Sequence, residues 1–166
     1  NFELPESVRR EPTPRLIVNF FADLHGPEDP EAGRDLGIAL VEFPAENSAQ
    51  AEAALQQALR VLEPAVRRVP DDLPALEAYC TALSRAGKNQ EALHHAIKLV
   101  EQSPENSVRL SLAASIAYAA NRHDLFARYL QKAVSLNPHF DSYHYWLGRD
   151  HVAHARLDRA IESFQR

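Results

Sequence analysis

Three prolines at equal spacing decide the fold, in the stretches Arg67-Arg68-Val69-Pro70, Glu101-Gln102-Ser103-Pro104 and Ser135-Leu136-Asn137-Pro138. Successive prolines lie 34 residues apart, and each separates two runs with apolar residues at helical spacing. Proline breaks a helix interior but is accepted in a helix's first turn, so each one predicts the end of one helix and the start of the next. A fixed period of this length indicates a stacked helical repeat.

Small residues recur with the same period. Counting from Leu73, Ser107 and Asp141 as first positions, the eighth and twentieth positions are mostly small: Cys80, Ala92, Ala114, Gly148 and Ala160. Small side chains at facing positions allow two helices to approach closely. Phe126, at position twenty of the middle repeat, departs from the pattern, although Ala127 is adjacent.

This pattern resembles the tetratricopeptide repeat family, most clearly at Leu147-Gly148, Ala160 and Phe164. His144 stands where the family has tryptophan, and Trp146 follows two positions later. The resemblance implies an all-α, right-handed superhelix of about three and a half helix-turn-helix repeats. It also implies a concave groove lined by the first helix of each pair.

The sequence divides into an N-terminal arm and a repeat array, residues 30–166. We expect repeats at 30–72, 73–106, 107–140 and 141–166, with an insertion in the first and the last incomplete. The insertion lies around 43–50, where Ser48 offers an N-cap for a helix over 48–68. Pro64 lies inside that helix and is expected to kink it or end it early.

Residues 1–29 hold four prolines and are expected to form an extended arm. Residues 16–21, Leu-Ile-Val-Asn-Phe-Phe, are apolar enough that we expect them to pack on the first repeats. At the other end no capping helix follows the last repeat. The exposed apolar face this implies would suit a partner, a homo-oligomer contact or a continuation of the chain. The chain begins at Asn1 and contains no methionine, so we expect it to be part of a longer protein.

The family resemblance also implies which residues face the groove. They occupy positions two, five, nine, twelve and thirteen of each repeat: Pro74, Glu77, Thr81, Ser84 and Arg85, then Val108, Ser111, Ser115, Tyr118 and Ala119, then Ser142, Tyr145, Arg149, Val152 and Ala153. Arg85, Tyr118, Tyr145 and Arg149 are the expected main contacts, because Tyr and Arg are enriched where interface energy concentrates. The alternatives are a solvated face, or a face covered by residues 1–29.

One variant of the family binds the C-terminal carboxylate of chaperones through lysine at position five and asparagine at position nine. The corresponding pairs here are Glu77/Thr81, Ser111/Ser115 and Tyr145/Arg149. That clamp is therefore absent, and a co-chaperone is not predicted. Arg149 alone retains the chemistry to hold a carboxylate through a bidentate pair.

No pattern for enzymatic chemistry is present. The sequence lacks a Gly-rich phosphate loop, HExxH, CxxC and CxxCH, and no base stands near Cys80 to activate it. We therefore predict no enzyme and no cofactor. Asp150, His151 and His154 lie at spacings that could share a metal ion on one helix face, and the alternative is that these histidines are packing residues.

The charge distribution favours a protein or peptide partner. The net charge is −5 with an isoelectric point near 5.9, which argues against nucleic-acid binding. Residues 107–166 nevertheless carry 8 basic and 5 acidic side chains, which hints at an acidic partner surface. No apolar run is long enough to predict membrane insertion.

A second, looser resemblance spans residues 8–42. There an Arg/Pro-rich stretch, the 16–21 run and Asp35-Leu36-Gly37-Ile38-Ala39-Leu40 look similar to the junction in bacterial multihaem cytochromes with a C-terminal repeat array. This implies an alternative function, the accessory region of a larger redox enzyme. The compartment would then be extracytoplasmic, and otherwise cytoplasmic.

Overall fold

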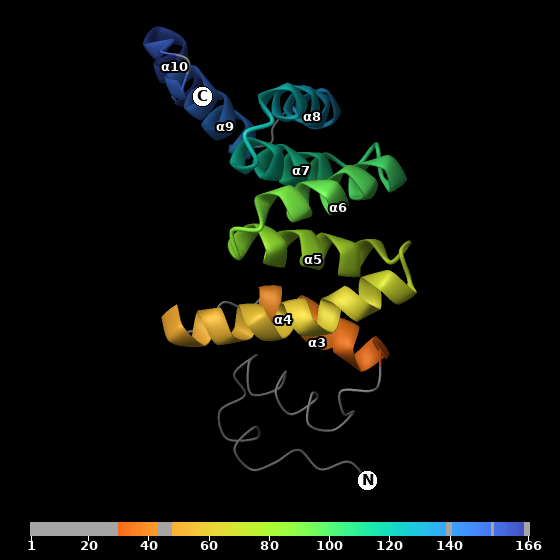
Figure 1. The fold of residues 1–166 in the computed structure, drawn as a ribbon. Coiled ribbons are helices and arrows are strands. Elements are labelled where there is room, and N and C mark those ends of the chain that lie inside the picture. The colour runs from red at the N-terminus through yellow and green to blue at the C-terminus, as the bar shows by residue number, and fades with distance from the viewer. Residues whose placement is uncertain (1–29, 43–47, 139–140, 154, 165–166) are drawn as a thin grey trace, which may run out of the picture. The chain divides into compact units, whose positions relative to one another are not determined.

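The computed structural model describes residues 30–42, 48–138, 141–153 and 155–164, and in these ranges the only regular elements are helices (Figure 1). In chain order they are α3 (Pro30–Glu42), α4 (Ser48–Arg68), α5 (Leu73–Arg85), α6 (Asn89–Gln102), α7 (Ser107–Ala119), α8 (His123–Leu136), α9 (Asp141–Ala153) and α10 (Leu157–Phe164). The prediction of an all-α fold is confirmed. The N-terminal arm, with residues 16–21, and most of the insertion lie outside the described residues.

The helices follow the period of the prolines. α5, α7 and α9 begin at Leu73, Ser107 and Asp141, each 34 residues after the last, and a second helix follows each of them after a short turn. The chain forms two compact units, residues 1–95 and 96–166, whose boundary falls within α6.

The turns between paired helices carry a second periodic feature. In the described part of the chain, Gly87, Asn121 and Ala155 have left-handed backbones, with φ of 74°, 59° and 56°. These positions are again 34 residues apart. In each turn the next residue's N–H bonds to a carbonyl five residues back: Lys88 to Leu83 at 2.9 Å, Arg122 to Ala117 at 2.8 Å and Arg156 to His151 at 2.8 Å. This is the Schellman ending of a helix.

Only Ala155 among these three is poorly suited to a left-handed backbone, because its Cβ meets the following carbonyl at a cost of about 1–2 kcal/mol. We therefore expect Ala155→Gly to raise the free energy of unfolding by about 0.5–1 kcal/mol. The same change at Ala127, an exposed position inside α8, should lower it by about 1 kcal/mol. Urea denaturation of both variants measures the two signs, and a loss of stability for Ala155→Gly would contradict this account.

In the first unit α3 packs against both α4 and α5, and α4 also packs against α5. α4 continues past Pro64 to Arg68, so the expectation that the helix ends early there is wrong. Burial of Leu62, Ala65 and Val66 around the proline compensates for the backbone hydrogen bond that proline cannot donate. The alternative expectation, a kink, stays a prediction.

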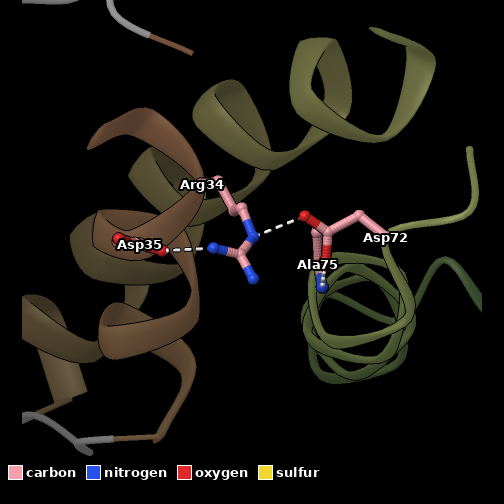
Figure 2. A network of polar contacts seen from close by, with 4 residues as sticks. All are labelled: Arg34, Asp35, Asp72 and Ala75. Carbon is pink, nitrogen blue, oxygen red and sulfur yellow. Dashed lines mark hydrogen bonds and ion pairs between the residues drawn. The ribbon is translucent and has the colours of Figure 1, made fainter. Parts of the chain in front are cut away.

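A polar contact fixes α3 to the start of α5 (Figure 2). The Asp72 carboxylate is the N-cap of α5, and its Oδ1 accepts a hydrogen bond from the Ala75 N–H at 3.1 Å. Its other oxygen, Oδ2, lies 2.5 Å from Nε of Arg34 on α3. Arg34 also pairs with Asp35 at 2.8 Å. One carboxylate therefore stabilises both a helix end and a contact between two helices.

Asp72→Ala removes both interactions, and we expect it to lower the free energy of unfolding by about 1–2 kcal/mol, mostly through the cap. Asp72→Asn keeps an oxygen that can accept from the Ala75 N–H but loses the charge, so its loss should be less than about 1 kcal/mol. Urea denaturation of the two variants separates cap from ion pair. Equal losses would show that the charge, rather than the cap, dominates at this position.

In the second unit α7 packs against α8 and α9, and α9 packs against α10. α7 is rich in alanine, and Ala113, Ala114 and Ala117 are fully buried. The small residues expected at helix contacts are likewise buried in both units: Cys80, Ala92, Ala114, Gly148 and Ala160. Phe126, the large exception, is 2% exposed and so belongs to the core.

Candidate interaction surface

Two of the groove residues expected in the first unit, Thr81 and Arg85, form hydrogen bonds within the chain. The Thr81 hydroxyl donates to the Glu77 carbonyl at 2.9 Å. Arg85, in the last turn of α5, donates through Nη1 to the Val41 carbonyl at 2.6 Å. Val41 lies in the last turn of α3, where carbonyls lack partners within the helix. Arg85 therefore stabilises a helix end, and its role as a partner contact stays a prediction.

Two of the serines expected to line the groove in the second unit, Ser111 and Ser115, offer little to a partner. Ser111 is only 7% exposed. The Ser115 hydroxyl donates to the Leu112 carbonyl on its own helix at 2.8 Å. The Ser115 side chain therefore bonds within α7 and that of Ser111 is buried, and contact with a partner at these positions stays a prediction.

Three of the expected groove residues of the second unit, Tyr118, Tyr145 and Arg149, come together around a tryptophan. Tyr118 of α7 and Tyr145 of α9 each lie 5.6 Å from the Trp146 ring, measured between centroids. The ring of Phe126 of α8 lies 5.2 Å from that of Tyr118 and 6.4 Å from that of Trp146, between centroids. Rings at these separations and tilts attract one another beyond the area they bury. We call Tyr118, Phe126, Tyr145 and Trp146 the aromatic cluster.

Arg149 lies over this cluster. Its guanidinium carbon is 5.1 Å from the ring centre of Trp146, 5.2 Å from that of Tyr118 and 5.8 Å from that of Tyr145. All three distances fall within the range of cation–π attraction. Among the described residues Arg149 forms no hydrogen bond and no ion pair, and its side chain is exposed.

Trp146 and Phe126 were not among the expected site residues. The sequence does carry a signal for them, because both are departures from the repeat pattern: a tryptophan two positions late and a phenylalanine at a small-residue position. In the structure both rings pack against Tyr118.

Apolar side chains are also exposed on the last two helices. Val152 on α9 is 50% exposed, and Leu157 and Ile161 on α10 are 61% and 55% exposed. Leu157 and Ile161 are four residues apart and so lie on one face of the helix. This agrees with the expectation of an apolar face at the last repeat. A homo-oligomer through that face stays a prediction.

The histidine site is only partly within the described residues, because His154 lies outside them. His151 is 9% exposed and lies next to Asp150 in α9. Over the described ranges no three His, Cys, Asp or Glu side chains are grouped to hold a metal ion. Metal binding at Asp150, His151 and His154 therefore stays untested.

Cys80 is fully buried, and burial raises the pKa of its thiol from 9.0 to about 12, with the Glu77 charge as a smaller cause. The thiol therefore stays protonated near neutral pH, and a thiolate nucleophile is not available there. Because the folded-state pKa lies above the ordinary value, the stabilisation linked to this group is complete below about pH 9. It is lost as the pH rises toward 12.

Within the described residues, none of the helices combines the length and the apolar character needed to cross a bilayer.

The paired helices and their buried small residues define a tetratricopeptide-type helical repeat fold, which confirms the resemblance seen in the sequence. The chain matches no protein-family model and no curated protein sequence. Its fold is similar to solved structures of MamA. MamA from Desulfovibrio magneticus RS-1 is 21% identical, with a TM-score of 0.76 over 96% of this chain and 86% of that chain.

Two further MamA structures give the same result. One is 13% identical, with a TM-score of 0.75 over 99% of this chain and 92% of the other. AMB-1 MamA is 18% identical, with a TM-score of 0.75 over 96% and 90%. At these identities the similarity establishes the shared fold. The resemblance to multihaem cytochromes is not tested by these structures.

Proposed function

We propose that this chain is a protein-interaction scaffold that binds a segment of a partner protein. The segment docks against Tyr118, Tyr145 and Arg149 on α7 and α9. The observation that carries this proposal is the position of Arg149 over three aromatic rings, with its side chain exposed. Tyr, Trp and Arg are the residue types that contribute most binding energy at protein interfaces.

The exposure of these side chains supports docking rather than a purely structural role. Tyr145 is 52% exposed although the rest of the aromatic cluster is more buried. Covering its ring removes apolar area from water at about 25 cal/mol per Å². The rings are fixed by mutual contact, so little of their side-chain entropy remains to be lost when a partner binds. The surface is thus organised before a partner arrives.

The chemistry of the chain favours a protein partner over other classes. The sequence lacks phosphate-binding and nucleophile motifs, and its net charge of −5 disfavours the binding of nucleic acid. The C-terminal third alone is basic, which suits an acidic segment. No observation within the described residues favours the cytochrome alternative. A search for CxxCH in the gene upstream of Asn1 tests it directly.

The proposal is tested with peptides selected from a random 12-residue display library on the purified chain. Their affinities are then measured by titration against four variants: Tyr118→Ala, Tyr145→Ala, Arg149→Ala and the control Leu136→Ala. Leu136 is an exposed apolar residue of α8 outside the aromatic cluster. We expect at least one of the first three changes to weaken binding tenfold or more, while the control has no effect.

Circular dichroism of each variant separates lost binding from lost structure. The proposal is wrong if no peptide is enriched, or if the selected peptides bind the folded Tyr118, Tyr145 and Arg149 variants as tightly as the wild type.

A further inference from the structure

The planar guanidinium group of Arg149 has its faces and its edges in different environments. Three rings lie within 6 Å of its guanidinium carbon, from Tyr118 on α7 and from Tyr145 and Trp146 on α9. Among the described residues no acceptor bonds to its N–H groups. A guanidinium stacked on aromatic rings keeps its in-plane donors available, and those donors match the two oxygens of a carboxylate.

The side chains around Arg149 extend this site along α9. Tyr145, Arg149 and Val152 stand at positions i, i+4 and i+7, so they share one face of the helix. Tyr145 and Val152 are 52% and 50% exposed. At 1.5 Å per residue they flank Arg149 by about 6 Å on one side and about 4.5 Å on the other. We call these three residues the α9 strip.

We propose that the α9 strip binds an internal acidic side chain, Asp or Glu, of a partner segment that has an apolar residue on each side of it. This inference rests on the proposed function and names the chemistry of its partner. The acidic side chain pairs with Arg149, and the flanking apolar residues cover Tyr145 and Val152. In an extended segment, side chains on one face repeat about every 6.6 Å, which is close to the step of about 6 Å from Tyr145 to Arg149 and longer than the step of about 4.5 Å to Val152.

An internal carboxylate fits the strip better than a chain terminus. Both neighbours of Arg149 on the strip are exposed and largely apolar, so a segment that covers both must continue past the arginine in each direction. A terminal carboxylate at Arg149 would leave one of the two uncovered. The surplus of basic residues in 107–166 supports an acidic partner.

The rings contribute by fixing the guanidinium before binding. A free arginine side chain loses about 2 kcal/mol of rotamer entropy when it is immobilised. Contact with Trp146 and Tyr118 restricts those rotamers in the unbound protein, so less entropy is lost when the carboxylate arrives. Lysine at this position would keep the charge without the planar stacking or the bidentate geometry.

The test is a double-mutant cycle on peptides that require Tyr145 for binding, taken from the display library. Each peptide is made with its acidic residue, with the matching amide (Glu→Gln or Asp→Asn), and with its C-terminus free or amidated. Affinities are read from the fluorescence of Trp146, the single tryptophan of the chain, for the wild type, Arg149→Lys and Arg149→Gln. Arg128→Lys, on an exposed site of α8, is the matched control.

We expect the peptide's acid-to-amide change to weaken binding to the wild type roughly tenfold, and to have less than about a twofold effect on Arg149→Gln. Arg149→Lys should remove most of this tenfold preference for the acidic peptide. Arg128→Lys and amidation of the peptide's C-terminus should leave the affinities unchanged. The affinity for the acidic peptide should also depend less on salt concentration in Arg149→Gln than in the wild type. A merely structural role for Arg149 would lower affinity for acidic and amide peptides alike.

The outcomes separate this inference from the proposed function. Tyr145-dependent peptides that lack an acidic residue, or that bind Arg149→Lys unchanged, overturn the inference and leave the interaction scaffold standing. Dependence on the free C-terminus, and not on an internal acid, overturns it as well. If no selected peptide depends on Tyr118, Tyr145 or Arg149, the proposed function fails and the inference fails with it.

Discussion

Replacing Phe126 with alanine is expected to lower the free energy of unfolding by about 3–5 kcal/mol. The side chain is 2% exposed and packs edge-to-face on Tyr118, and Trp146 lies 6.4 Å away between ring centres. Removing the ring loses its transfer free energy and leaves a cavity beneath both neighbours. Urea denaturation followed by circular dichroism measures the loss. The Trp146 emission of the folded variant reports whether the cluster has loosened.

The control is Leu136→Ala, which removes an apolar side chain from the same helix at a 38% exposed position. It should cost less than about 1 kcal/mol. Alanine is the residue that the repeat pattern places at position twenty. The alternative outcome for Phe126→Ala is therefore that α8 moves to fill the cavity left by the ring. A loss below about 1 kcal/mol would show that such closure occurs and that the ring is not required.

Features that depend on neighbouring residues could be predicted from the sequence. The starts of α5, α7 and α9 follow from prolines and small residues whose effects act within a turn or two of the helix. The left-handed turn position recurs with the same period but is occupied by Gly87, Asn121 and Ala155. Three different residue types at equivalent positions leave no repeated residue in the sequence, so this turn could not be predicted from the pattern.

Features that depend on distant partners could not be predicted. Arg85 was expected to face a partner, yet its guanidinium bonds the Val41 carbonyl, 44 residues earlier in the chain. A repeat position specifies a face of the helix but not what lies across from it. The same limit applies to Ser111, which is buried although its position is one of those expected to line the groove.

The candidate site was predicted in part, because its members come from two different causes. Tyr118, Tyr145 and Arg149 occupy repeat positions that the family resemblance implies for a groove. Trp146 joins them because it is displaced by two positions, which turns it by about 200° around the helix axis. The placement of Arg149 over three rings depends on this displacement, and only the three-dimensional structure shows it.

A glycine-to-alanine change in α3 is expected to have opposite effects at two positions one helical turn apart. At Gly33 an added Cβ would lie 3.8 Å from the Val61 Cβ, an ordinary contact. Gly33→Ala should therefore raise the free energy of unfolding by about 0.5–1 kcal/mol, because alanine is the better helix former. Gly33→Ala thus measures the gain from helix propensity alone, and it serves as the control for Gly37.

At Gly37 the same methyl group meets the core. Its Cβ would lie 2.5 Å from Cγ and 2.7 Å from Cδ2 of Leu62, a fully buried side chain of α4. Leu62 has no solvent into which to rotate, so α3 and α4 must separate, and overpacking of this kind costs about 1–3 kcal/mol. We expect Gly37→Ala to be less stable than Gly33→Ala by that amount in urea denaturation. Equal stabilisation by both changes would show that α3 and α4 do not approach closely at Gly37.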